Sequence, residues 1–446
     1  MGMKAPLIKV TPPGPRAREI VEKDEKLLMQ SFARWYPLVV KRGYNAVLED
    51  VDGNFYIDFN SGIAVTNVGH SHPKVVEAIK AQAEKFLHYS LTDFYYELAV
   101  EAAEILTRIV PVKDGKVFYT NSGTESNEAA LKVVRGYFKG TRPYVISFIG
   151  SFHGRTYGSM SLSASKTVHK KYFSPLVPGI IHVPYPYPYR CPFKASSPEE
   201  CAEMALSYME DWVFARLVDP SEVSGIFIEP ILGEGGYVVP PDNFLPGLER
   251  LARKHGILLV TDEVQSGFGR TGKWFASEHW GISPDVVALA KGISAGLPAG
   301  AIVGRAEVMS LPKGAHANTF GGNPVALAAF KASVQVLSEG YVERAYKLGK
   351  EAIDYLEREL SDVEMVGEVR GKGFMIGVEL VKNRRTKEPA RKELEAVLME
   401  SFRRGVLPIG AGMSTVRIAP PLTIEEELLF TGLEIVVKTI REVGRE

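Results

Sequence analysis

The sequence has little cysteine, no excess of either charge and no long apolar run. Its 446 residues include two cysteines, Cys191 and Cys201, which are too few for a framework of disulfides or a structural zinc site. Lysine plus arginine total 53, as do aspartate plus glutamate, so the formal net charge is zero and a general polyanion binder is excluded. No apolar run could span a bilayer, and the first residues lack an apolar signal-peptide core. These absences predict a soluble, cytoplasmic protein that binds neither nucleic acid nor membrane.

Apolar runs alternate with helical patterns through the middle of the chain. Because 446 residues exceed one typical core, we expect two domains or one large domain with an appended small one. Helical patterns start at Pro73 and extend over 125–138 and 243–254. Near-continuous apolar runs predict strands covered on both faces at 117–120, 144–149, 225–229, 257–262, 286–290 and 299–303. This alternation predicts an α/β fold whose mainly parallel sheet is flanked by helices.

The two ends of the chain have a different pattern. Residues 49–59 predict a hairpin with Asp52-Gly53 as its turn. After about residue 330 come two long amphipathic helical stretches, with strand signals at 375–380 and 415–420. We therefore predict a large domain of residues 70–329 and a smaller α+β domain built from residues 1–69 and 330–446.

The segment KVFYTNSGTESNEAALKVV (116–134) predicts a strand, a short polar turn and a helix. Ser122, Gly123 and Thr124 lie where the helix begins. Unpaired backbone N–H groups and the helix dipole make such a place an anion site, and two hydroxyls add donors. The alternative is an ordinary helix cap followed by an acidic first turn that contains Glu125.

Two charged residues follow apolar strands. Asp262 ends the run ILLVTD, at the strand end where parallel α/β sheets bind ligands. It could bind a metal, a ribose hydroxyl or a protonated ring nitrogen, or it could only cap a turn. Lys291 follows DVVALA and is succeeded by small residues. A lysine in an apolar setting has a lowered pKa and is a usable nucleophile, although a lysine that reaches solvent would give the same pattern.

Two further strand ends carry candidate side chains. IEPILGEGG places Glu229 at a strand end and Glu234 among glycines, and SFHGRT places Phe152, His153 and Arg155 in a glycine-flanked loop. An aromatic at a strand end usually packs in the core, and the loop cations could equally be solvated.

Nucleotide and metal motifs are weak in this chain. The glycine and lysine spacing of 267–273 imitates a phosphate-binding P-loop, but Trp274 replaces the metal-binding hydroxyl residue and GxGxxG is absent. The GHSHP motif favours a helix start over a metal site, so no metal is expected. An anion site, a stacking aromatic, an aspartate and a lysine at strand ends together form the set that pyridoxal 5'-phosphate needs.

Eight motifs occur in the order GIAVTNVGHSHP, NSGTESNEAA, FHGRT, IEPILGEGG, TDEVQSGFGRTG, AKGISAGLP, TFGGNP and VRIAPPLT. From about Gly53 to Pro421 the sequence therefore resembles a class III, ornithine/4-aminobutyrate-type aminotransferase of pyridoxal-phosphate fold type I. The resemblance implies that fold and that cofactor.

The resemblance also implies roles around the cofactor ring. Lys291 would bind the cofactor covalently and later transfer the Cα proton. Asp262 would pair with the ring nitrogen and Gln265 with the ring hydroxyl. Phe152 would stack on the ring with His153 beside it.

Other implied roles concern the phosphate and the subunits. Ser122, Gly123 and Thr124 would bind the phosphate, and Glu229 would orient groups on the cofactor side. Thr319, in TFGGNP, would reach the phosphate of the neighbouring subunit. The resemblance thus implies a homodimer with shared active sites, with a higher oligomer left open.

Four residues are implied to contact the substrate. Arg417 would bind the α-carboxylate in one half-reaction, and Glu234 would pair with Arg417 when an ω-amino substrate is bound. Arg155 could hold a distal carboxylate. Ile63 replaces a tyrosine that members acting on ornithine carry, which favours the 4-aminobutyrate branch.

The predicted reaction is amino transfer from an amino acid, either ω-amino such as 4-aminobutyrate or α-amino, to a 2-oxo acid such as 2-oxoglutarate. A racemase or epimerase on the same scaffold would share removal of the Cα proton and return it to the opposite face. No motif separates these two hypotheses. A nucleotide-binding enzyme or a non-catalytic binding protein is disfavoured because Lys291 and Asp262 are both present.

Overall fold

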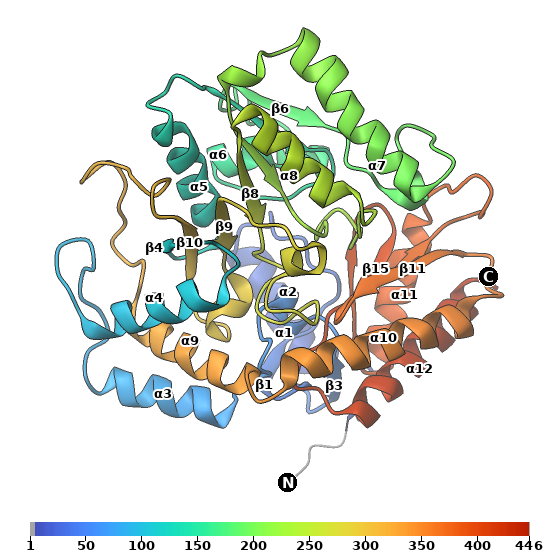
Figure 1. Cartoon of the computed structure of the whole chain (residues 1–446). Helices are drawn as coiled ribbons and strands as arrows, with labels where there is room; N and C mark the ends of the chain where they lie inside the picture. The colour runs from blue at the N-terminus through green and yellow to red at the C-terminus, as the bar shows by residue number, and fades with distance from the viewer. Residues whose placement is uncertain (1–4, 446) are drawn as a thin grey trace.

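The computed structural model describes residues 5–445, and its central element is a seven-stranded sheet (Figure 1). The strand order is β4-β10-β9-β8-β7-β5-β6. Strands β5 to β9 pair in parallel, whereas β10 is antiparallel to both of its neighbours. The strands are β4 (Gly115–Thr120), β5 (Tyr144–Phe148), β6 (Ile180–Val183), β7 (Val223–Ile228), β8 (Leu258–Asp262), β9 (Val286–Leu289) and β10 (Gly300–Arg305). The predicted α/β fold with a mainly parallel sheet is confirmed, and β6 is a strand that was not predicted.

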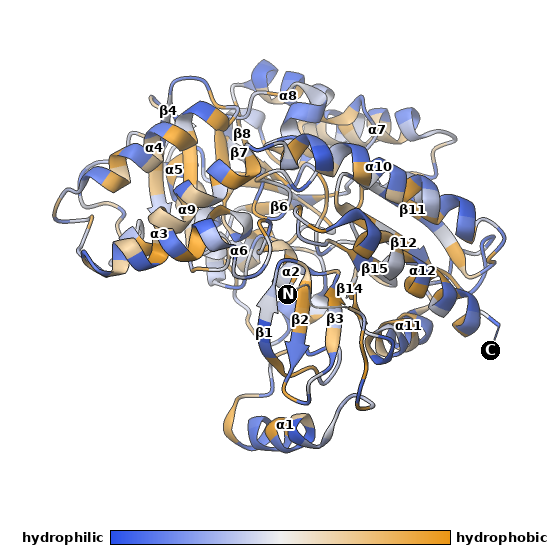
Figure 2. Cartoon of the chain, turned by 90° about the horizontal axis from the view of Figure 1, so that it is seen from below, coloured by the Kyte–Doolittle hydropathy of each residue, from blue (hydrophilic) through white to orange (hydrophobic). Residues whose placement is uncertain are grey.

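Helices cover both faces of this sheet. In β9, Val286 and Ala288 pack on the side of α5 (Gly123–Tyr137). The alternate residues Val287 and Leu289 pack on the side of α4 (Glu97–Ile109) and α9 (Pro324–Leu337). This two-sided burial explains why the strands are continuous apolar runs. Figure 2 shows the central strands mainly in the hydrophobic colour, whereas the outer helices mix both colours.

Local sequence signals explain several helix ends. Pro73 occupies the first turn of α3 (Pro73–Ala83), where a missing N–H costs nothing. Gly256 ends α8 (Phe244–His255) with a φ of 61°, a left-handed conformation that suits glycine. The predicted helices at Pro73, 125–138 and 243–254 are therefore present. The middle of the chain also contains α6 (Tyr157–Leu162), α7 (Pro198–Ser207) and the π-helical segment η3 (Tyr208–Phe214).

The two ends of the chain share a four-stranded sheet of order β1-β2-β3-β13. The predicted hairpin is the antiparallel pair β2–β3, and β13 joins β3 in parallel. Segments far apart in the sequence thus lie side by side. The elements are α1 (Pro15–Leu27), β1 (Val40–Tyr44), β2 (Val47–Asp50), β3 (Phe55–Asp58), α2 (Ser61–Ala64) and β13 (Val406–Leu407).

The C-terminal region builds a second four-stranded sheet, of order β11-β12-β15-β14. Three long helices follow residue 340, one more than the sequence pattern predicted. Helix α9 crosses residue 330, and the division into domains at 69/70 and 329/330 stays a prediction. The elements are α10 (Tyr341–Leu360), β11 (Val366–Lys372), β12 (Met375–Leu380), α11 (Arg391–Arg403), β14 (Ile409–Ala411), β15 (Thr415–Ile418) and α12 (Glu426–Val443).

The two cysteines form a disulfide, Cys191–Cys201, which joins the segment before α7 to α7 itself. The cysteine count had predicted no framework of disulfides, and this single bond is an addition to that expectation. Among the helices of residues 5–445, none combines the length and the apolar character needed to cross a membrane. The cytoplasmic location stays a prediction.

Candidate active site

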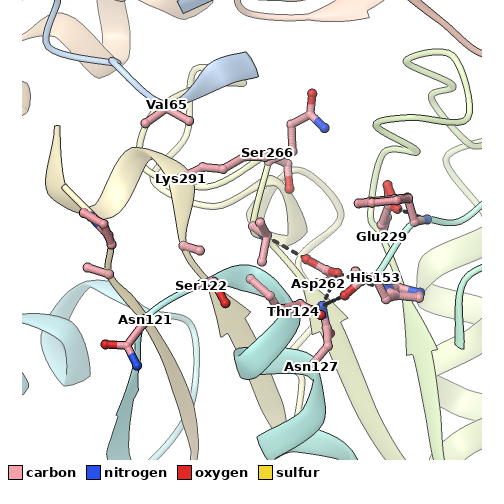
Figure 3. Close-up of a pocket in the computed structure, with 18 of the residues that line it drawn as sticks. Val65, Asn121, Ser122, Thr124, Asn127, His153, Glu229, Asp262, Ser266 and Lys291 are labelled. Carbon is pink, nitrogen blue, oxygen red and sulfur yellow. Dashed lines mark hydrogen bonds and ion pairs between the residues drawn. The ribbon is translucent and has the colours of Figure 1, made fainter. Parts of the chain in front are cut away.

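The carboxyl ends of β4, β5, β7, β8 and β9 meet at one edge of the central sheet, around a cavity of about 450 Å³ (Figure 3). Because parallel strands end at the same edge, residues that follow them in sequence are brought together. The cavity is lined by ten of the predicted residues, namely Ser122, Gly123, Thr124, Phe152, His153, Arg155, Glu229, Asp262, Gln265 and Lys291.

The N-terminus of α5 forms one wall of this cavity. Ser122 has extended backbone and caps the helix, because its Oγ accepts a hydrogen bond from the Glu125 N–H at 3.4 Å. A Cβ at Gly123 would lie 2.7 Å from Cγ1 of Val264, so only glycine fits there. The hydroxyl of Thr124 bonds to Thr156 at 2.8 Å and holds the loop after β5 against the helix. The 15-residue helix thus directs free N–H groups and its positive dipole end toward the cavity.

Asp262, at the end of β8, is held by three donors. Its Oδ2 accepts hydrogen bonds from Nδ2 of Asn127 and from Nδ1 of His153, both at 2.7 Å. Its Oδ1 accepts from the backbone N–H of Val264 at 3.0 Å. Figure 3 shows these side chains converging from α5, the loop after β5 and β8. An ionised carboxylate still has capacity for a further donor in the cavity.

Glu229, at the end of β7, orients the loop that carries Phe152. Its Oε1 accepts a hydrogen bond from the Phe152 N–H at 2.6 Å, and its Oε2 accepts from the Gly233 N–H at 2.5 Å. Burial raises the pKa of this carboxyl to about 7, with His153 opposing the shift and Asp262 adding to it. Glu229 therefore positions the backbone of two loops at the cavity.

Lys291 begins the short 3₁₀-helix η6 (Lys291–Ser294) directly after β9. Its φ of 47° is unusual for a residue with a side chain, and such backbone strain is common at functional sites. Burial lowers the pKa of its amine to about 8, and the positive charge of Arg417 acts in the same direction. A larger fraction of this amine is thus neutral near pH 7 than for a lysine in water.

Arg417 and Glu234 do not line the cavity but lie beside it. Arg417 is a buried residue of β15, and its Nη1 lies 3.8 Å from Oε2 of Glu234, in the loop after β7. The same Nη1 donates to Oε1 of Gln265 at 3.2 Å, and the hydroxyl of Tyr237 donates to that oxygen at 2.8 Å. Gln265, which lines the cavity, thus joins Arg417 to it.

Of the remaining predicted residues, Arg155 lines the cavity, whereas Ile63 and Thr319 do not. Arg155 lines the cavity with its guanidinium 5.1 Å from the ring centre of Phe152. Ile63 has a positive φ and is half exposed, and Thr319 is exposed; neither lines the cavity.

The sequence analysis missed several residues that support the site, above all Asn127, Tyr237 and Lys166. Asn127 follows Gly123 by one helical turn, so helical spacing could have placed it on the same face. Tyr237 and Lys166 carry no such signal, because their contacts join loops far apart in sequence.

The residues present fit pyridoxal 5'-phosphate. A cluster of N–H groups suits a phosphate, the Asp262 carboxylate suits a protonated ring nitrogen, and a lysine of lowered pKa suits an aldehyde. Within residues 5–445, the buried Nε2 of His153 has no hydrogen-bond partner. This polar atom beside Asp262 is a further donor or acceptor for a bound ring.

The sheet, its helices and the residues at its edge define a pyridoxal-phosphate-dependent enzyme of fold type I. The chain belongs to the class III aminotransferase family, whose model, described as aminotransferase class-III, matches residues 30–440. A solved relative is a thermostable (S)-enantioselective omega-transaminase from Thermomicrobium roseum, with a TM-score of 0.89, 30% identity, and coverage of 96% of this chain and 99% of that one.

Curated relatives catalyse more than one reaction. The chain is 38% identical to an alanine/serine racemase from Pyrococcus horikoshii, over 99% of this chain and 94% of the relative. It is 39% identical to a 4-aminobutyrate aminotransferase from Mycobacterium leprae, over 96% of both chains. The two sequence identities are nearly equal. Sequence similarity therefore establishes the family but does not distinguish amino transfer from racemisation.

Proposed function

We propose that this protein transfers the amino group of an amino acid to a 2-oxo acid, and that an ω-amino acid such as 4-aminobutyrate is among its donors. The observation that carries the proposal is the pair formed by Arg417 and Glu234 beside the cavity, 3.8 Å apart. A transaminase must bind two different substrates in turn in one site. Arg417 can bind the α-carboxylate of one substrate when Glu234 moves away. When the other substrate has no carboxylate at that place, Glu234 can pair with Arg417 instead.

The residues around the cavity have distinct proposed tasks. The phosphate would be held at the N-terminus of α5 by Ser122, Gly123 and Thr124. Gln265 would hydrogen-bond to the ring hydroxyl. When bound, pyridoxal 5'-phosphate supplies an electron-withdrawing ring that stabilises negative charge at Cα. Asp262, fixed by Asn127 and His153, would keep the ring nitrogen protonated.

Lys291 would act twice. Its neutral amine would bind the cofactor aldehyde, and after release by the substrate amine it would take the Cα proton. In amino transfer Lys291 would then deliver that proton to the carbon of the cofactor aldehyde. Phe152, whose backbone Glu229 fixes, would cover one face of the ring and exclude water.

Racemisation is the second candidate, and the alanine/serine racemase relative favours it. It needs a second acid that returns the proton to the opposite face of Cα. Glu234, in the loop after β7, lies between the cations Lys166 and Arg417. Charge pairing of this kind suits recognition of a carboxylate more than proton transfer.

One experiment separates the two reactions. A single L-amino acid or ω-amino acid, without an oxo acid, should change the absorbance of the bound cofactor once and stoichiometrically. Adding 2-oxoglutarate should restart turnover, because the amino group then has an acceptor. Continuous formation of the D-enantiomer without any oxo acid, with solvent deuterium entering Cα, would instead identify a racemase.

We also propose a homodimer in which Thr319 reaches the phosphate of the partner subunit. Thr319 lies next to a group of exposed aromatic and aliphatic side chains, which we call the apolar surface: Leu87, Tyr89, Phe94, Tyr95 and Phe320. Tyr89 packs on Phe94, with ring centres 4.6 Å apart, and Phe320 on His88 at 5.2 Å. Tyr95 is 98% exposed. Apolar surface of this kind favours burial against a second copy.

A further inference from the structure

Glu234 lies between two cations, and the nearer one is Lys166. The Nζ of Lys166 is 2.6 Å from Oε1 of Glu234, whereas Nη1 of Arg417 is 3.8 Å from Oε2. The side chains of Lys166 and Glu234 are each 22% exposed, so this pair is shielded from most of the solvent. Lys166 therefore competes directly with Arg417 for one carboxylate.

The residues just before Lys166 are fixed against the cavity loop. Ala164 N–H donates to the Ser151 carbonyl at 2.8 Å, and Gly150 N–H donates to the Ala164 carbonyl at 3.0 Å. The His153 N–H donates to Oγ of Ser163 at 2.8 Å. The segment that ends at Lys166 is thus attached to the loop that carries Phe152 and His153.

The backbone of Glu234 is fixed as well. Its carbonyl accepts a hydrogen bond from the Gly412 N–H at 2.8 Å. A Cβ at Gly235 would lie 2.5 Å from the Gly150 carbonyl oxygen, so the two loops approach as closely as glycine allows. With the Glu234 backbone held, its side chain is the part that can move between Lys166 and Arg417.

The charge of Glu234 needs a partner in either position. Burial raises the pKa of its carboxyl, but Arg417 and Lys166 together hold that pKa below the usual range, so the group is ionised at neutral pH. A buried carboxylate without a counter-ion is costly. When a substrate carboxylate takes Arg417, Glu234 loses that cation and keeps Lys166.

We propose that Lys166 is a specificity-determining residue that retains Glu234 while Arg417 binds a substrate carboxylate. The inference rests on the proposed roles of Arg417 and Glu234 and adds a third member to that pair. Without Lys166, Arg417 is the one cation of this group that remains for Glu234. A substrate carboxylate must then displace the Glu234 carboxylate from Arg417.

The test uses cofactor-loaded protein and two probes, glutarate for the carboxylate site and pentylamine for the amine end. Lys166→Met should weaken glutarate binding in calorimetric titration by about tenfold, within the usual range of coupling between sites, and leave pentylamine binding unchanged. Lys166→Arg should bind glutarate like the wild type, because it keeps the cation. Lys171→Met, an exposed lysine nearby, is the matched control and should change neither affinity.

A double variant tests whether Lys166 acts through Glu234. In the Glu234→Gln background, Lys166→Met should no longer weaken glutarate binding, because no carboxylate remains to cover Arg417. An equal loss in both backgrounds would mean that Lys166 attracts the probe directly, and no loss in either would leave it without a role; both results overturn the inference. If Lys166→Met fails to fold, Lys166→Gln serves in its place.

Failure of the proposed role of Arg417, on which this inference rests, has a different signature. Arg417→Gln should lose glutarate binding, whichever reaction the enzyme catalyses. If that variant binds glutarate normally, the assignment of Arg417 is wrong. If it is defective while Lys166→Met is normal, only the role of Lys166 is refuted.

Discussion

At the residue scale, the chemistry proposed for this site depends on two ionisable groups, Asp262 and Lys291. Three donors fix the carboxylate of Asp262, so the protein itself sets the orientation of this carboxylate. For Lys291, burial disfavours the charged form of the amine and so lowers its pKa. One edge of a sheet thus holds an oriented carboxylate beside an amine whose pKa is lowered to about 8, and such preorganisation is typical of catalytic sites.

Asp262→Asn should retain cofactor and lose turnover by about 100-fold or more, because a neutral amide no longer favours the protonated ring nitrogen. Single-turnover absorbance measurements would check this. Asp242→Asn, an exposed aspartate, should keep full activity. Near wild-type turnover in Asp262→Asn would assign the ring nitrogen to another group.

The rate at which cofactor-free protein binds pyridoxal phosphate covalently should rise with pH through about 8 and level off above it. An amine attacks only when neutral, and the lowered pKa of Lys291 places that change about two units below the usual value for lysine. Arg417→Met should move the midpoint upward, since the Arg417 charge helps to lower this pKa. Stopped-flow absorbance gives the rate; a midpoint near 10 would contradict the assignment.

At the scale of elements, close backbone approaches position the C-terminal region. A Cβ at Gly349, inside α10, would lie 2.2 Å from the Gly373 carbonyl oxygen, in the turn between β11 and β12. The neighbour is backbone, so it cannot move aside as a flexible side chain would. Glycine inside a helix is normally unfavourable, and here packing outweighs that cost.

Gly349→Ala should therefore destabilise the protein by about 1–3 kcal/mol, although alanine is the better helix former. Thermal unfolding would show a lower Tm. Glu351→Ala, on the exposed side of the same helix, is the control and should leave the Tm nearly unchanged. A higher Tm for Gly349→Ala would mean that the turn yields easily.

Sequence patterns predicted elements better than contacts between them. The strands of the central sheet were recognisable because burial on both faces makes them continuous apolar runs. Strand β6 was not predicted, because its sequence IIHV is short and includes the polar residue His182. The site residues that follow strands were predictable by position. Lys166 and Tyr237 were not, because no periodicity joins positions as far apart as Lys166 and Glu234, which are separated by 68 in sequence.

At the scale of the whole molecule, the apolar surface next to Thr319 predicts self-association. Phe320→Glu should produce monomers and lower activity, because a charge there opposes burial and removes the partner's Thr319 from the shared site. Analytical ultracentrifugation of the holoenzyme measures the mass. Trp212→Glu, an equally exposed aromatic elsewhere, is the control. A fully active monomer would refute the shared site.

Arg417 lies on β15, while the residues proposed to hold the cofactor of the same subunit lie between 122 and 291. A ribosome releases these segments in order, so the part of the chain that holds the cofactor leaves first. Arg417, which we propose binds a substrate carboxylate, follows only after the intervening residues. The growing chain therefore contains the residues proposed to hold the cofactor before it contains the residue proposed to select the substrate.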